Sequence, residues 1–141
     1  MKKLILKGRM IYGGIAEGEA LVTKKGLGGM GLFDVDTGTV IELGHDWKDQ
    51  VVKGKVLVFK VARGSSSWSF WHHILRFLGT GPAAYVVTEC NPQIAGGAVV
   101  ARAPSVTELD RDPTEVIETG DWVKVDGDKG LVEVTKKKAG Q

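Results

Sequence analysis

Two short apolar runs, each followed by a helical pattern, constrain the fold of this chain most. Residues 56–59 and 84–87 are continuous apolar segments of strand length, a pattern typical of strands buried on both faces. In residues 68–78, which follow the first run, large apolar side chains recur at helical spacing, which predicts a substantially buried helix. After the second run, Asn91-Pro92 opens another helical segment that ends before Pro104. Strand, helix, strand, helix predicts a parallel sheet with right-handed crossover helices.

The two ends of the chain carry shorter strand signals. Residues 10–12 and 18–22 are short β-like segments near the start. Near the end, residues 122–125 and 131–134 flank the turn-like residues 126–130, as in a hairpin. The length of 141 residues suits one domain, with a core expected over about residues 8–135. We therefore predict a single α/β domain in which a barrel-like antiparallel β layer accompanies the parallel sheet.

Composition excludes several classes of protein. The net charge is only +2, and the one basic run, Lys136 to Lys138, lies at a chain end, so no nucleic-acid partner is expected. No apolar run approaches the roughly 20 residues of a membrane span, so no membrane partner is expected either, and we predict a cytoplasmic location. A single cysteine, Cys90, excludes an intramolecular disulfide framework and an all-cysteine metal site built by this chain alone.

The most informative local feature is the loop Arg63-Gly64-Ser65-Ser66-Ser67, between the first apolar run and its helix. Ligands bind at the carboxyl ends of parallel strands, and a helix start offers unpaired N–H groups to an anion. Glycine permits a close approach of the backbone, serine hydroxyls can donate hydrogen bonds, and Arg63 adds a planar charged fork. A plain helix cap is the alternative interpretation. Because three consecutive serines exceed what one cap needs, we favour a loop that binds an anionic ligand.

The histidines give weaker signals. His72 and His73 are adjacent, so in a helix they point about 100° apart and cannot chelate one metal ion. We expect one to be packed and the other exposed. His45 lies in a polar segment and is expected to be exposed. No metal ligands are therefore predicted on this chain.

The chain also resembles a known family. Its ordered motifs, spread over roughly residues 13 to 134, are similar to the small-subunit, or swivelling-domain, proteins of the aconitase X family. The matching segments are Ile15-Ala16-Glu17-Gly18-Glu19-Ala20-Leu21-Val22, Leu27-Gly28-Gly29, Asp36-Thr37-Gly38, Gly54-Lys55-Val56-Leu57-Val58-Phe59, Arg63-Gly64-Ser65-Ser66, Pro82-Ala83-Ala84, Ala95-Gly96-Gly97-Ala98 and residues 119–126. The resemblance implies a swivelling β/β/α domain. Arg63 stands where the family usually has lysine.

The resemblance also implies an activity. Family members belong to hydro-lyases made of two polypeptides or fused domains, in which a large component holds an iron–sulfur cluster or iron and the small component caps the active site. By this resemblance Ser65 is the catalytic proton acceptor, with Arg63, Gly64, Ser66 and Ser67 as substrate-binding residues. The activities of the family are dehydration of phosphomevalonate and of cis-3-hydroxyproline. We thus expect a dehydratase small subunit, active only with a large subunit, whose substrate is a small anion; this chain itself would hold no cofactor.

A second resemblance predicts different chemistry. Swivelling phosphohistidine domains share the glycine-rich strings near both ends, but their histidine opens the helix after the second buried strand. Here residues 89–95 occupy that position without a histidine, so phosphotransfer is not supported. A non-catalytic anion-binding or regulatory module of related fold is the alternative to the enzyme.

Four questions stay open from the sequence. It leaves open the substrate and the oligomeric state of the protein. Trp68 and Trp71 could belong to the core, to a pocket or to an interface. Residues 26–31 could form a mobile lid or a long turn.

Overall fold

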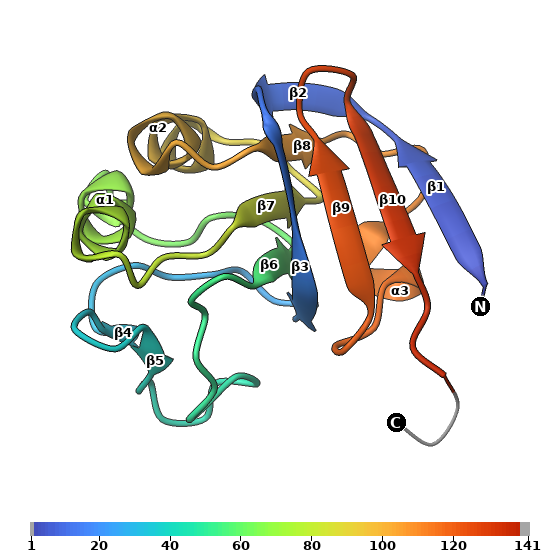
Figure 1. Cartoon of the computed structure of the whole chain (residues 1–141). Coiled ribbons are helices and arrows are strands. Elements are labelled where there is room, and N and C mark those ends of the chain that lie inside the picture. Colours follow the sequence, from blue (N-terminus) through green and yellow to red (C-terminus); the bar gives the residue numbers. More distant parts are fainter. Residues whose placement is uncertain (1, 139–141) are drawn as a thin grey trace.

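A computed structural model describes residues 2–138, and in this part of the chain the elements form one curled sheet with helices packed against it (Figure 1). The strands are β1 (Lys3–Lys7), β2 (Arg9–Tyr12), β3 (Ile15–Val22), β4 (Phe33–Asp34), β5 (Thr39–Val40), β6 (Val56–Phe59), β7 (Ala84–Val87), β8 (Ser105–Thr107), β9 (Trp122–Asp126) and β10 (Leu131–Thr135). The helices are α1 (Trp68–Leu78), α2 (Pro92–Ala101) and α3 (Pro113–Val116). None of the helices in residues 2–138 is long and apolar enough to cross a bilayer.

The main sheet has the strand order β1-β10-β9-β3-β6-β7-β8-β2, while β4 and β5 form a separate small hairpin. Its centre, β3-β6-β7-β8, is parallel, which confirms the predicted strand–helix–strand–helix unit. Strand β3 joins the two expected layers, because Ile15 to Glu19 pair antiparallel with β9 and Ala20 to Val22 pair parallel with β6. The two edge strands, β1 and β2, are separated only by Gly8, so the sheet curls like a barrel.

The continuous apolar runs are explained by cores on both faces of the sheet. In β6, Leu57 and Phe59 pack into the core beneath the helices, whereas Val56 and Val58 pack into a second core with residues of β9 and β10. All four are fully buried. Helices α1 and α2 lie side by side over the first of these cores (Figure 1).

Helix α1 departs from the predicted burial pattern. Its apolar stripe suggested a largely buried helix, but Phe70, Phe77 and Leu78 are exposed, and only Trp68, His72 and Leu75 are buried. His72 thus occupies a core position, because both of its ring nitrogens have hydrogen-bond partners there. The expectation that one of the two adjacent histidines is packed and the other exposed is confirmed, since His73 lies at the surface.

The sequence analysis did not predict five other elements: β1, the small-hairpin strands β4 and β5, β8 and α3. Strand β1 has charged ends and a short apolar centre, yet its Leu6 is fully buried, so the core begins before residue 8. Strand β8 and the short helix α3 give too few residues for a periodic signal. Both lie between α2 and the β9–β10 hairpin in the sequence.

Candidate functional site

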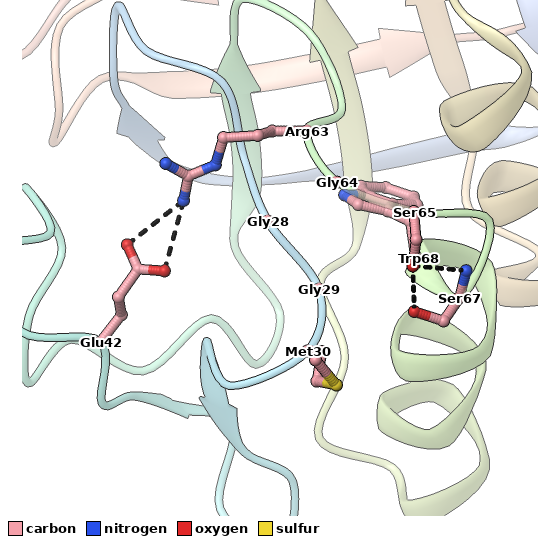
Figure 2. Close-up of a pocket in the computed structure, with 9 residues that line it drawn as sticks. All are labelled: Gly28, Gly29, Met30, Glu42, Arg63, Gly64, Ser65, Ser67 and Trp68. Carbon is pink, nitrogen blue, oxygen red and sulfur yellow. Dashed lines mark hydrogen bonds and ion pairs between the residues drawn. The ribbon is translucent and has the colours of Figure 1, made fainter.

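A pocket of about 460 Å³ lies where the segments that follow β3 and β6 meet the start of α1 (Figure 2). Its lining residues come from three parts of the chain: Gly28, Gly29 and Met30; Glu42; and Arg63, Gly64, Ser65, Ser67 and Trp68. This is the carboxyl-end edge of the parallel strands, as the sequence predicted for the serine loop. Of the five predicted site residues, the structure places Arg63, Gly64, Ser65 and Ser67 in this pocket.

Backbone hydrogen bonds hold the two loops of the pocket together. Leu27 N–H donates to the Val61 carbonyl (2.9 Å), and Arg63 N–H donates to the Leu27 carbonyl (2.8 Å), extending the parallel pairing beyond the strands. Leu27 is fully buried, so the glycine-rich residues 26–31 are anchored at this point. The parallel pairing of β3 with β6 therefore brings Gly28 and Gly29 against the serine loop.

Ser65 and Ser67 form a hydroxyl pair at the start of α1. Their Oγ atoms are 2.7 Å apart, and the Ser67 N–H donates to Ser65 Oγ at 3.3 Å. Ser67 is the N-cap residue, as expected of one of the serines, but its side chain caps no helix N–H and contacts Ser65 instead. Gly64 has φ of 108°, a conformation that only glycine adopts readily, and it turns the chain toward the helix.

Arg63 does not stand free in the pocket, because Glu42 pairs with it. The Arg63 Nη2 atom lies 3.3 Å from each carboxylate oxygen of Glu42. A Cβ at Gly28 would come within 3.3 Å of the same Nη2 atom, so glycine there lets the guanidinium lie close against the loop. The sequence analysis missed Glu42, because nothing in the local sequence indicates that this carboxylate lies beside Arg63.

Ser66 is the one predicted site residue that the structure leaves outside the pocket. Its side chain is exposed, and its carbonyl accepts a hydrogen bond from Ser69 Oγ at 3.4 Å. Gly28, Gly29 and Met30 line the pocket instead, and sequence reasoning missed their role. The adjacent glycines were the signal, since a loop that walls a pocket against a helix favours residues without side chains.

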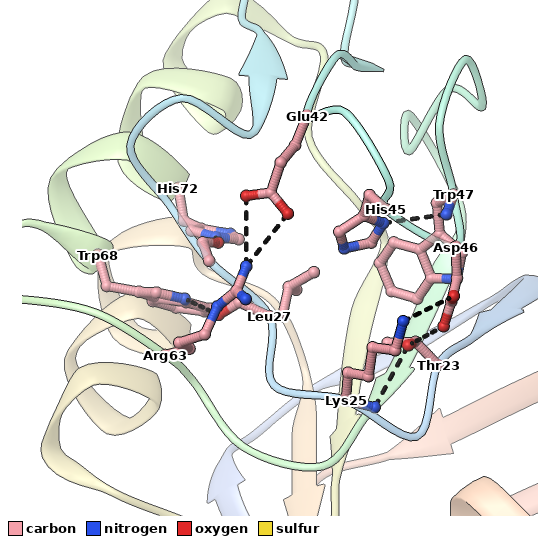
Figure 3. Close-up of polar contacts among 11 residues, drawn as sticks. Thr23, Lys25, Leu27, Glu42, His45, Asp46, Trp47, Arg63, Trp68 and His72 are labelled. Atoms are coloured by element: carbon pink, nitrogen blue, oxygen red, sulfur yellow. Dashed lines mark hydrogen bonds and ion pairs between the residues drawn. The ribbon is translucent and has the colours of Figure 1, made fainter.

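Trp68 and His72 support the glycine-rich loop of residues 26–31 from the core side (Figure 3). The Trp68 Nε1–H donates to the Leu27 carbonyl at 2.8 Å, and the indole stacks on the His72 ring with centroids 3.6 Å apart. His72 Nε2 lies 3.1 Å from the Gly28 carbonyl, which can only accept, so Nε2 carries the proton. His72 Nδ1 then accepts from the Tyr85 hydroxyl at 2.8 Å. Trp68 therefore belongs both to the core and to the pocket, whereas Trp71 is half-buried.

Burial governs the ionisation of this network. It lowers the pKa of His72 to about 4, and it raises the pKa of Tyr85 above its ordinary value. Both groups are consequently neutral near pH 7. His72 acts as a fixed hydrogen-bond donor to the loop rather than as a proton carrier.

We predict that the low pKa of His72 makes stability depend on pH. Between its ordinary pKa of 6.5 and about 4, the unfolded chain binds a proton at this position that the folded chain does not. The free energy of unfolding is therefore complete above pH 6.5 and falls as the pH drops toward 4, by about 3 kcal/mol at most. Urea unfolding across this range measures the loss, and NMR titration of the imidazole identifies its source.

That experiment needs a control for the titration of His45. Burial lowers its pKa also, so the variant His45→Gln removes its share of the same trend. A folded-state pKa of His72 near 6.5 in the NMR titration would contradict the assignment.

His45 was expected to be exposed, and this is wrong. It is half-buried, and its Nδ1 accepts from the Trp47 N–H at 2.9 Å (Figure 3). Beside it, Asp46 accepts from the Thr23 hydroxyl at 2.6 Å and pairs with Lys25 at 3.3 Å. The Thr23 hydrogen bond is the main reason why the pKa of Asp46 is lowered. These contacts fix the segment that carries Glu42 beside the end of β3.

The described residues of this chain do not fit an iron–sulfur cluster or an iron ion. Among residues 2–138, no group of three His, Cys, Asp or Glu side chains could hold a metal. The single cysteine, Cys90, is exposed next to the start of α2, and burial together with the nearby Glu108 raises the pKa of its thiol. A thiolate ligand is thus not favoured even at that one position.

Fold and pocket together define the class of this protein: a swivelling β/β/α domain with a serine-lined pocket at the carboxyl ends of its parallel strands. The family model described as "Aconitase X swivel domain" matches residues 5–134. The chain therefore belongs to the aconitase X swivel-domain family, which confirms the resemblance noted in the sequence.

Individual relatives agree with this assignment. The phosphomevalonate dehydratase small subunit of Methanocella arvoryzae is 41% identical over 92% of this chain and 98% of its own length. The protein of the same name from Methanosarcina mazei is 38% identical, covering 96% of this chain and 94% of its own length. The crystal structure of aconitase X from Thermococcus kodakaraensis (holo-form) superposes with a TM-score of 0.88 at 37% identity, covering 94% of this chain and 99% of that chain.

Proposed function

We propose that this chain is the small subunit of a two-component dehydratase whose substrate is phosphomevalonate. The names of its relatives support the substrate, and the nearly complete coverage of those relatives supports the small-subunit role. Removal of water from cis-3-hydroxyproline, the other activity implied by the family resemblance, is the competing substrate assignment. None of the compared relatives above carries that name.

The observation that carries the proposal is the Ser65–Ser67 hydroxyl pair inside the pocket. Ser65, as an alkoxide, removes the proton from the carbon next to the substrate carboxylate. The electron pair of that C–H bond forms the double bond, and the hydroxyl on the neighbouring carbon departs. The proton leaves Ser65 with that hydroxide as water, which restores the ionised serine, so the cycle balances without a redox step.

A serine hydroxyl is a weak base, so its ionised form needs support. The Ser67 N–H and hydroxyl both lie within hydrogen-bonding distance of Ser65 Oγ. The positive end of the α1 dipole adds to them at the same position. Fixed donors of this kind stabilise an oxyanion far more when water is excluded. The open pocket of the single chain lacks that exclusion, and we propose that the large subunit provides it.

The large subunit is also the proposed holder of any iron–sulfur cluster or iron. The residues of this chain do not fit such a group, as described above. The part assigned to this chain is therefore limited to removing the proton and binding the anionic end of the substrate.

Arg63 is the proposed binding group for the substrate's phosphate or carboxylate. Glu42 contacts only its Nη2 atom, so the remaining guanidinium N–H groups can bind an anion while Glu42 orients the side chain.

We predict that Arg63→Ala raises the KM of the assembled enzyme about tenfold or more, with a smaller change in kcat, because an anion contact made in the ground state is lost. Arg9→Ala is the matched control, since Arg9 makes a similar exposed ion pair with Glu108 outside the pocket. Steady-state kinetics of both variants measure the difference. Equal KM values for Arg63→Ala and the wild type would remove Arg63 from the binding site.

The decisive experiment combines this chain with its large subunit and offers phosphomevalonate and cis-3-hydroxyproline separately. The expected result is water elimination from phosphomevalonate by the mixture and none by either subunit alone. Turnover of cis-3-hydroxyproline instead would overturn the substrate assignment. Binding of small anions to the complex without any turnover would favour the non-catalytic module over the enzyme.

A further inference from the structure

The outer surface of the helix layer exposes apolar side chains that the core does not use. Phe77 is 81% exposed, and Phe70, Leu78, Val99 and Val100 are exposed as well. Phe70 and Phe77 are seven residues apart, nearly two helical turns, so they share one face of α1. Helices α1 and α2 lie side by side (Figure 1), and Val99 and Val100 of α2 line one groove together with Phe77. Exposed apolar side chains that gather around one groove are typical of an interaction site.

Cationic side chains border the same surface. A groove of about 560 Å³ runs between the two helices, lined by Tyr12, His73, Arg76, Phe77, Val99, Val100 and Arg102. Among residues 2–138, neither Arg76 nor Arg102 makes an ion pair, whereas Arg9 and Arg63 both do. Arg102 moreover occupies the left-handed C-cap position of α2, with φ of 51°, where glycine is usual. Two uncompensated guanidinium groups therefore flank an apolar strip.

We infer that this groove docks a segment of the large subunit that carries carboxylates among apolar side chains. The inference rests on the proposed function, because it assumes a large subunit. Guanidinium groups pair with carboxylates in a planar, two-point geometry, and the exposed Phe77 supplies the apolar anchor between them. The N-cap of α1, Ser67, lines the pocket, so a partner that covers the pocket can continue along the face of α1 that carries Phe70 and Phe77.

The charges also argue against a second copy of this chain as the occupant. A two-fold symmetric contact would place the groove of one copy against the same groove of the other. The guanidinium groups of one groove would then face those of the other, and like charges brought together at an interface are unfavourable.

The test is a charge reversal in the groove, the double variant Arg76→Glu/Arg102→Glu. Its control is Arg111→Glu, because Arg111 likewise makes no ion pair among residues 2–138 and does not line the groove. Titration calorimetry with the purified large subunit measures each dissociation constant, and circular dichroism checks that each variant is folded. We expect the double variant to bind at least tenfold more weakly at low salt and the control to bind within twofold of wild type.

A second variant, Phe77→Ser, tests the apolar part without a change of charge. We expect it to bind at least tenfold more weakly than wild type, by the same factor at low and at high salt. Wild-type affinity in both groove variants would overturn the inference, as would light scattering that shows the groove variants abolishing a homodimer instead. If the wild-type chain itself does not bind the large subunit, the proposed function is contradicted, and the docking site with it. Binding by the wild type with equal binding by the variants would contradict only the docking site.

Discussion

Ser65→Ala in the assembled two-subunit enzyme is expected to lower kcat by about a thousandfold, because it removes the proposed proton acceptor while leaving the pocket in place. The substituted side chain is exposed and hydrogen-bonds to Ser67, which is not part of the core, so folding and binding to the large subunit are expected to persist. The measurement is steady-state kinetics of the complex, with titration calorimetry to verify that the two subunits still associate.

The control for this experiment is Ser69, in the first turn of α1. Ser69→Ala removes a hydroxyl that contacts only the Ser66 carbonyl and does not line the pocket, so its kcat is expected to stay within about twofold of wild type. Ser67→Ala is expected to fall between the two, by about tenfold, since it removes one of the donors to Ser65 Oγ. Near-normal turnover by Ser65→Ala would mean that another group takes the proton.

The sequence predicted the part of this site that consecutive residues of one loop form. Gly64, Ser65 and Ser67 follow one strand and open one helix, so a single local pattern placed them in the pocket. Glu42 comes from a different segment, and its contact with Arg63 depends on how that segment folds back beside β3. No local pattern encodes such a contact, and the sequence analysis therefore assigned Arg63 to an anionic ligand without a partner from this chain.

The same contrast holds for the fold. Strands β6 and β7 were predicted with their observed bounds, because Val56–Phe59 and Ala84–Val87 are buried on both faces and need no polar residues. Helix α1 was predicted in place, but its buried face was not. The Tyr85 hydroxyl and the Gly28 carbonyl satisfy both nitrogens of His72, so a polar ring could enter the core while Phe70 and Phe77 stayed outside. Hydropathy alone does not indicate hydrogen-bond partners that other elements supply.

The two adjacent glycines of α2, Gly96 and Gly97, differ in the space that a side chain would find. A Cβ at Gly97 would overlap the Trp68 ring, whereas a Cβ at Gly96 would meet only the Ser69 Cβ, at 3.9 Å. Gly97→Ala is therefore expected to lower the free energy of unfolding by about 3 kcal/mol, since neither the packed helix nor the buried indole can give way. Gly96→Ala is expected to raise it by roughly 0.5–1 kcal/mol, because alanine is the better helix former. Urea unfolding of both variants measures the difference.

Gly97→Ala also has an expected consequence for the pocket. The Trp68 indole donates a hydrogen bond to the Leu27 carbonyl and stacks on His72, whose Nε2–H donates to the Gly28 carbonyl. A displaced indole therefore weakens both hydrogen bonds to the loop opposite Ser65. Activity of the assembled enzyme should then fall at temperatures where the variant is still folded, while Gly96→Ala retains it. If Gly97→Ala proves as stable and as active as Gly96→Ala, the close packing of α2 on Trp68 does not determine the geometry of the pocket.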